Sequence, residues 1–348
     1  MSTHPYERHS ETEYPHARDV LEREVSENGF AAGWCMHAKP VPDYYFDVHV
    51  HYADRSKANI HTVIAPEAAC CLKMGVKRSL LLIRIHGLIP PTDDKSMESL
   101  QDEDYTVEAL RPLLAGFPLD ESAVLAAWLH HSCPEPQLIH AAKGLGMRAI
   151  KLHNAPMITL GDPAESWLTP AWQETFAAMT AYRMPVLWHV TQRLPSSDYT
   201  GGGRNTYWQD GWKNGVRYGN EELLQVFLTC CARNPGIPFI GAHQLHIGWE
   251  RLDKLFTGYP NLYVDTTVGC QLRIGDTFYP HDKDFLRGIF IKWADRILFG
   301  TDTFWRGCPS SETQEVIRMS QNFIERLDLP ECVLRKVCHE NAERLLSL

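Results

Sequence analysis

The chain has 348 residues, of which 44% are hydrophobic, and a formal net charge of −9 at pH 7. This length suits one large α/β barrel or two ordinary domains, and the hydrophobic content allows a sizeable core. A negative charge without a basic block argues against nucleic acids and anionic membranes as partners. No apolar run approaches the roughly 20 residues that a membrane-spanning helix needs.

Residues 1–42 are expected to form an appendage with a charged helix over His16–Glu27. The first residues are polar and rich in His and Glu, so they do not resemble a secretory signal. The ten cysteines are scattered and include no Cys-x-x-Cys pair. This pattern predicts reduced thiols in a cytoplasmic protein rather than disulfides or a cysteine zinc site.

From residue 43 onward, apolar strand-like segments alternate with amphipathic helix-like segments. The expected strands are Tyr44–Tyr52, Ser79–Gly87, Val124–His131, Arg148–Asn154, Pro185–Thr191, Pro238–His243, Leu262–Thr267 and Arg296–Thr303. The expected helices are Pro66–Gly75, Pro136–Leu145, Pro170–Tyr182 with Thr169 as N-cap, Glu221–Arg233, Glu250–Phe256, Asp284–Trp293, Thr313–Leu327 and Glu331–Leu346. Eight apolar strands, each followed by a helix, predict a parallel (β/α)8 TIM barrel over residues 43–348. The rival is an open doubly wound sheet, whose dinucleotide-binding form is disfavoured because no Gly-x-Gly-x-x-Gly follows the first strand.

Two segments depart from this alternation. Leu88–Pro112 carries an acidic stretch, which we interpret as a solvated surface excursion. The insertion 193–220 follows the strand that ends at His189, so it should lie on the face where barrel enzymes place their active sites. Its clustered aromatic residues favour an ordered lid or pocket wall.

Histidines and one aspartate end several of the expected strands. Side chains alternate along a strand, so His49 and His51 should point to the same side and be able to hold one metal ion. His189, His243 and Asp302 end later strands. Because all strand ends of a barrel converge on one face, the sequence predicts a site there for zinc or another divalent first-row metal.

Four motifs, in this order, resemble those of a known family: Phe46–His51 (FDVHVH), Pro185–His189 (PVLWH), Phe239–His243 (FIGAH) and Arg296–Asp302 (RILFGTD). They are similar to the amidohydrolase superfamily and most similar to its amidohydrolase 2 branch. That branch contains aminocarboxymuconate semialdehyde decarboxylase, aromatic acid decarboxylases and several lactone hydrolases. The C-terminal segment Asn341–Leu346 matches the same branch, so the resemblance covers residues 43–348.

The resemblance implies that His49, His51, His189 and Asp302 bind one divalent ion. Zinc is the first expectation, with manganese, cobalt or iron as alternatives. It also implies that His243 is a catalytic or substrate-polarising histidine. The branch often has glycines after this histidine, whereas this chain has Gln244-Leu245-His246, so His246 is a candidate to replace or assist His243.

Further candidates for substrate binding are cationic or imidazole side chains near the same strand ends. Lys151 and His153 should face inward by alternation. We interpret Lys151 as a cation that binds an acidic substrate or pairs with a carboxylate; in other superfamily branches a carboxylated lysine on this strand bridges two metals. Arg84 is a candidate to hold a substrate carboxylate or to form a rim ion pair, and Arg193 is a candidate on the insertion.

The expected chemistry follows from these donors. A divalent metal supplies hydroxide near neutral pH, Asp302 accepts and returns a proton, and His243 hydrogen-bonds the carbonyl oxygen. We therefore predict a metal-dependent hydrolase of a small, carboxylated substrate with a lactone, ester or amide bond. The alternatives are a non-oxidative decarboxylase of an aromatic or unsaturated acid and, from another class, a catalytically silent binding protein. A homodimer braced by residues 1–42 is a further expectation.

Overall fold

A computed structural model describes residues 42–53, 60–88, 105–115, 121–192, 206–267 and 283–348. The expected helix His16–Glu27, the acidic stretch 93–104 and Arg193 lie outside the described residues. The site and the barrel that carries it lie largely within them.

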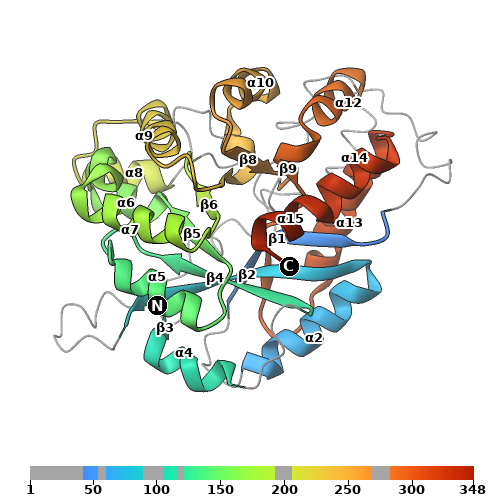
Figure 1. Ribbon diagram of the computed structural model, residues 1–348, viewed down its shortest axis with the longest axis horizontal. Helices are drawn as coiled ribbons and strands as arrows, with labels where there is room; N and C mark the ends of the chain where they lie inside the picture. Colours follow the sequence, from blue (N-terminus) through green and yellow to red (C-terminus); the bar gives the residue numbers. More distant parts are fainter. Residues whose placement is uncertain (1–41, 54–59, 89–104, 116–120, 193–205, 268–282) are drawn as a thin grey trace.

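The described strands form one parallel sheet that curls round (Figure 1). They are β1 Tyr45–Tyr52, β2 Val76–Gly87, β3 Tyr105–Thr106, β4 Ala123–Leu129, β5 Ala149–His153, β6 Val186–His189, β7 Phe239–Gly241, β8 Leu262–Asp265, β9 Ile297–Leu298 and β10 Thr303–Trp305. Short β3 pairs only with β2, so it lies off the main path. The expected (β/α)8 barrel is confirmed.

Closure depends on the last expected strand, which is present as two pieces. β9 pairs with β8, and β10 pairs with β1 on the other side. Between them, the carbonyl of Phe299 accepts a bond from Val48 N–H at 3.0 Å, and Asp302 N–H donates to the carbonyl of His49 at 2.8 Å. β9, this segment and β10 together are therefore the eighth barrel strand, with a break where Asp302 lies.

Helices accompany the strands, and most of them form an outer ring (Figure 1). They are α2 Ile60–Lys73, α4 Val107–Leu114, α5 Pro136–Gly144, α6 Ala155–Leu160, α7 Pro170–Ala181, α8 Thr206–Lys213, α9 Asn220–Arg233, α10 Trp249–Gly258, α12 Lys283–Lys292, α13 Ser311–Arg326, α14 Glu331–Arg335 and α15 Asn341–Leu346, with a π-helical turn Lys336–Glu340 between the last two. Thr169 caps α7 as expected, because its hydroxyl accepts from Trp172 N–H.

Three expected boundaries are wrong. Helix α2 begins at Ile60 rather than at Pro66, which lies inside the helix instead of at its first position. The excursion 88–112 ends earlier than expected, because residues from Val107 onward form α4. The strand expected over Pro238–His243 ends at Gly241, because the backbone of His243 adopts a positive φ of 55°.

The inner and outer faces of the strands form separate cores. The inner cluster includes Leu80 and Leu82 from β2 and Val124 and Ala126 from β4, and residues of α15 pack against it. Arg84 and Trp128 lie two residues further along the same faces of β2 and β4. The barrel interior is thus apolar below and polar at the carboxyl ends of the strands, as the period of two requires.

The outer face carries the aromatic layer between strands and helices. Trp188 is fully buried there, with ring centroids 4.8 Å from Trp167 and 5.4 Å from Phe227. Trp188 therefore packs against the outer helices, although it directly precedes His189. Trp208 of α8 is also fully buried, and its indole N–H donates to the Gln192 carbonyl at 3.0 Å, so α8 is tied to the end of β6. The role of the insertion as a lid stays a prediction.

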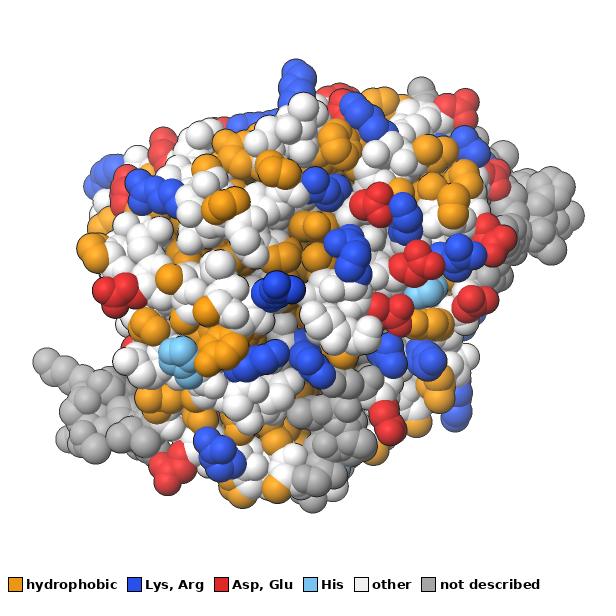
Figure 2. All heavy atoms as spheres, in the orientation of Figure 1, with side chains coloured by type: hydrophobic (Ala, Val, Ile, Leu, Met, Phe, Trp, Pro, Cys, Tyr) orange, Lys and Arg blue, Asp and Glu red, His pale blue; other side chains and the backbone are white. Residues whose placement is uncertain are grey.

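The charge distribution agrees with the composition. In Figure 2, acidic and basic side chains are interspersed with apolar ones, and neither sign forms an unbroken block on this face. No helix in the described part of the chain is long and apolar enough to span a bilayer.

Candidate metal centre

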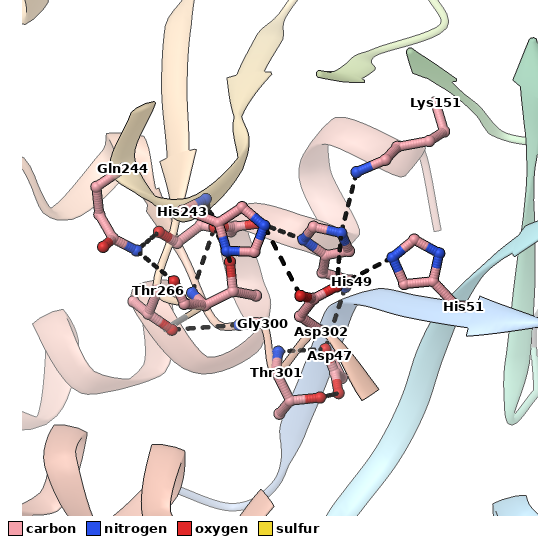
Figure 3. A network of polar contacts seen from close by, with 12 residues as sticks. Asp47, His49, His51, Lys151, His243, Gln244, Thr266, Gly300, Thr301 and Asp302 are labelled. Atoms are coloured by element: carbon pink, nitrogen blue, oxygen red, sulfur yellow. Dashed lines mark hydrogen bonds and ion pairs between the residues drawn. The ribbon is translucent and has the colours of Figure 1, made fainter. Parts of the chain in front are cut away.

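Asp302 lies at the centre of the site, surrounded by three imidazoles (Figure 3). Its Oδ1 is 3.0 Å from His51 Nε2 and 3.3 Å from His49 Nε2, and its Oδ2 is 3.8 Å from His243 Nε2. Four of the residues singled out in the sequence are thus brought together although they span 254 positions, from 49 to 302. All three histidines are buried.

The break in the eighth strand turns Asp302 into the barrel. Asp302 has a φ of 60°, which an aspartate tolerates better than most residues. Buried Asp47 fixes the neighbouring backbone by accepting from Thr301 N–H at 3.0 Å and from the Thr301 hydroxyl at 2.5 Å. Gly300 passes so close to the site that a Cβ there would lie 2.8 Å from Thr267 and 3.3 Å from His49. Asp47 therefore positions Asp302, a role that its place in the first motif did not reveal.

Asp265, at the end of β8, sets the tautomers of two histidines. Its Oδ2 is 2.8 Å from His49 Nδ1, and since a carboxylate only accepts, this nitrogen carries the proton. Its Oδ1 accepts the Thr267 hydroxyl proton at 2.6 Å and the His243 N–H at 2.8 Å. Because the hydroxyl proton is used, Thr267 Oγ1 accepts from His243 Nδ1 at 3.0 Å. The Nε2 atoms of His49 and His243 therefore carry lone pairs.

This is the arrangement found around metal-binding histidines, whose second nitrogen commonly donates to a carboxylate. Sequence reasoning placed a strand over Leu262–Thr267 but missed Asp265. The available signal was a charged residue at the end of an otherwise apolar strand.

Burial sets the protonation of the site. It lowers the pKa values of His49, His153 and His189 well below the ordinary value, and that of His243 to about 4. Burial alone raises the pKa of Asp302, but the neighbouring His49, His51 and His243 outweigh it and hold that pKa below its usual range. Neutral imidazoles and an ionised carboxylate are the forms that bind divalent cations.

His189 and His246 extend the donor set. His189 lies at the end of β6, with its ring 4.3 Å from that of His153 and 4.5 Å from that of His243. Ligand atoms of His49, His243 and Asp302 lie within 4.8 Å of one another, and so do those of His189, His243 and His246. The Nε2 atoms of His189 and His243 are buried without a hydrogen-bond partner in the described part of the chain. Buried imidazole lone pairs beside a carboxylate fit a zinc-type cation.

The two cationic candidates lie at different depths in the barrel. Lys151 is fully buried, its Nζ lies 3.0 Å from His49 Nε2, and burial lowers its pKa to about 8 against the opposing effect of Asp302 and Asp265. Arg84 lies higher, with its guanidinium 4.3 Å above the Trp128 ring.

Two aromatic residues missed in the sequence flank His51. Trp128 lies edge-on to His51 at 5.2 Å and stacks with His153 at 5.7 Å. On the other side, Phe304 stacks on His51 at 4.8 Å. Trp128 and Phe304 are only partly buried, so the site is bordered by aromatic faces.

Comparison with known proteins identifies the family of this chain. A sequence model described as amidohydrolase matches residues 129–348. The chain belongs to the amidohydrolase family. The predicted assignment to an amidohydrolase-superfamily enzyme is thereby confirmed. The match includes His189, His243 and Asp302 but starts after β1, so His49 and His51 lie outside it.

Three solved structures illustrate the likeness in fold. A putative amidohydrolase from Staphylococcus aureus has a TM-score of 0.55 at 16% identity, covering 88% of this chain and 100% of the other. 5-Carboxyvanillate decarboxylase from Sphingomonas paucimobilis has a TM-score of 0.53 at 13% identity, covering 88% and 99%. Dihydroorotase from Campylobacter jejuni has a TM-score of 0.52 at 16% identity, covering 88% and 84%. A comparison with curated proteins gives no match.

Proposed function

We propose that this amidohydrolase-family protein is a metal-dependent hydrolase of a small, carboxylated substrate with a lactone, ester or amide bond. The observation that carries the proposal is the convergence of three imidazole Nε2 atoms on the Asp302 carboxylate. In this proposal His49, His51, His189 and Asp302 hold one divalent ion, zinc first and manganese, cobalt or iron as alternatives. The chemistry that such an ion supplies is the activation of water near neutral pH and the polarisation of a carbonyl.

Asp302 is the proposed proton carrier. The pKa of its carboxyl is held below the usual range, so the group is ionised and can accept the proton of the attacking water. The lowered pKa favours return of the proton from Asp302 to the leaving group. Asp47 and the break in the eighth strand keep this carboxylate directed into the barrel.

The tautomer of His243 refines its proposed role. With Nδ1 donating to Thr267, Nε2 presents a lone pair and not a proton. Burial lowers the pKa of His243 to about 4, so the imidazolium that could donate from Nε2 is scarce at neutral pH. His243 is therefore better suited to accept a proton or hold a cation than to donate to a developing oxyanion.

The substrate carboxylate is assigned to Arg84. Its guanidinium stacks on Trp128, and Trp128 in turn contacts His51, so the cation lies one aromatic ring away from the donor cluster. A planar guanidinium suits two-point binding of a carboxylate. The aromatic face of Trp128 also supports the second candidate, a decarboxylase of a planar aromatic acid. His153 and His246 border the same space as weaker substrate contacts.

Activity assays on metal-defined protein test the proposal. Chelator-stripped enzyme is reloaded with each metal and offered carboxylated lactones, esters and amides beside aromatic acids. Acid release measures hydrolysis and CO2 release measures decarboxylation. We expect metal-dependent hydrolysis that His49→Ala and Asp302→Asn abolish and the control His130→Ala retains. Activity that survives complete removal of the metal, or that survives in Asp302→Asn, would refute the hydrolase proposal. A folded protein that binds no metal and shows no turnover would favour the silent binding protein.

Location and assembly stay predictions. The scattered cysteines support a cytoplasmic enzyme, and the eight cysteines in the described residues are free thiols. The proposed homodimer depends on residues 1–42, of which residues 1–41 lie outside the described residues.

A further inference from the structure

The imidazole of His153 differs in tautomer from those of His49 and His243. Its Nδ1 lies 2.9 Å from the backbone nitrogen of Ala155. A backbone N–H can only donate, so this Nδ1 accepts and carries no proton. The proton of the neutral ring is therefore on Nε2, whereas the Nε2 atoms of His49 and His243 present lone pairs. His153 thus offers a hydrogen-bond donor where the other two offer acceptors.

The bond to Ala155 follows from the way the chain leaves β5. The strand ends at His153 and α6 begins two residues later at Ala155, whose N–H is among those that have no partner inside the helix. Buried Asn154 fixes this junction to the next strand. Its side-chain NH2 donates to the Val190 carbonyl at 2.8 Å, and its side-chain oxygen accepts from the Trp188 indole at 3.0 Å. The tautomer of His153 is therefore set by the fold of the chain itself.

His153 lies between the proposed carboxylate anchor and a proposed metal ligand. It pairs in register with His189 of β6, and the two ring centroids are 4.3 Å apart. On its other side the ring stacks with Trp128 at 5.7 Å, and the Arg84 guanidinium lies 4.3 Å from the same Trp128 ring. A substrate whose carboxylate binds Arg84 and whose reacting carbonyl reaches the metal ligands therefore passes His153.

The surroundings of His153 suit a donor to developing negative charge. Among the described residues, Ala155 is the hydrogen-bond partner of this ring through Nδ1, which leaves the Nε2–H for a bound molecule. Only 5% of His153 is exposed, so a hydrogen bond made there competes little with water. A donor whose proton and orientation are already fixed needs no reorganisation when charge appears on the substrate. Because its lone pair is used by Ala155, His153 is not a metal ligand.

We propose that His153 is the catalytic hydrogen-bond donor that binds, through Nε2–H, the substrate carbonyl oxygen as it becomes an oxyanion. The inference deepens the hydrolase function proposed above and rests on it, and it supplies the donor that the tautomer of His243 does not provide. As water adds to the carbonyl carbon, the electron pair of the C=O bond moves to the oxygen. The proton stays on Nε2 and stabilises that charge. One such donor typically contributes roughly 100- to 1000-fold in kcat.

Two variants separate the donor at Nε2 from the bond to Ala155. In His153→Asn the amide oxygen lies near the place of Nδ1 and can still accept from Ala155, but no group reaches the place of Nε2. In His153→Gln the amide NH2 reaches that place and can donate. A purely structural role through Ala155 predicts that asparagine is tolerated better than glutamine, and the donor role predicts the reverse. Circular dichroism and metal analysis check that the variants are folded and equally loaded.

Binding of 3-phosphonopropionate measures the donor without relying on turnover. This molecule joins a carboxylate to a tetrahedral phosphonate whose oxygens resemble the oxyanion. Isothermal titration calorimetry with the full-length protein in the presence of zinc gives its dissociation constant. We expect His153→Asn to weaken binding by about tenfold or more, because a hydrogen bond to a charged oxygen is lost, and His153→Gln to weaken it by about threefold or less. The control His140→Asn makes the same change in an exposed histidine of α5 and should bind like the wild type.

Nitrogen-15 NMR of histidine-labelled, metal-free protein reads the tautomer directly, with His153→Gln used to assign the signal. We expect the proton on Nε2. A proton on Nδ1, or wild-type protein that binds the probe no more tightly than His153→Asn, overturns the proposal. Hydrolysis that His153→Asn leaves unchanged also overturns it, and the hydrolase proposal then stands. Probe binding that depends on His153 in a protein without hydrolytic activity supports the donor, although the hydrolase proposal fails.

Discussion

Replacing Asp265 with asparagine should weaken metal binding without changing any proposed ligand. The carboxylate accepts from His49 Nδ1 at 2.8 Å, from His243 N–H at 2.8 Å and from the Thr267 hydroxyl at 2.6 Å. An amide has one acceptor oxygen and one donor NH2. If its oxygen keeps the bonds to His243 and Thr267, the NH2 faces His49 Nδ1 and moves the His49 proton to Nε2, where a metal needs the lone pair.

The magnitude follows from that change in tautomer. Loss of a single partner of a metal-binding histidine typically costs 10–100-fold in affinity, and Asp265 supports His49 directly and His243 through Thr267. We therefore expect Asp265→Asn to weaken metal affinity by about 100-fold, which corresponds to about 2.8 kcal/mol of binding free energy. Thr267→Val removes only the relay to His243 and should cost about 10-fold or less.

Competition with a chromophoric chelator at pH 7.5 measures these dissociation constants. The matched control is Asp162→Asn, which makes the same chemical change in a carboxylate 2.6 Å from His131, outside both donor groups. Its affinity should equal that of the wild type. A folded Asp265→Asn protein with wild-type affinity, or a loss no larger than that of the control, would show that Asp265 does not set the ligand tautomer.

Three further predictions concern Lys151, Gln244 and Arg84. Burial lowers the pKa of Lys151 from 10.5 to about 8, so between these values the unfolded chain binds a proton that the folded protein has released. Across this pH window the free energy of unfolding of the wild type should therefore rise by about 3 kcal/mol more than that of Lys151→Met. The same pH dependence of this free energy in both proteins would contradict the prediction. Gln244→Ala leaves two buried carbonyls without their donor and no longer holds the turn 243–246, whose residues have positive φ. Urea unfolding should therefore show a free energy of unfolding lower by about 2–4 kcal/mol, whereas the exposed control Gln225→Ala should lose almost none. Arg84→Met should raise KM for a carboxylated substrate at least tenfold with little change in kcat, while a neutral analogue is unaffected; an equal effect on both substrates would argue against carboxylate binding by Arg84.

Much of the barrel could be predicted because its signals are local. Alternation with a period of two identifies inward faces, so Lys151 and His153 were expected inside, as found. Closure of a parallel sheet then brings strand ends together, which is why His49, His51, His243 and Asp302 meet although they come from separate segments. The sequence alone was therefore enough to predict that these residues share one location.

The orientation of those groups was decided only in three dimensions. Asp47 fixes Thr301 across 254 positions, Asp265 sets the proton on His49 across 216, and Gln244 holds the turn through carbonyls more than 20 positions away. No local propensity predicts four successive left-handed residues, because each is unfavourable by itself and the turn exists only through these distant bonds. The chain thus determines which donors arrive at the mouth of the barrel, whereas tertiary hydrogen bonds determine which nitrogen of His49 and of His243 keeps its lone pair.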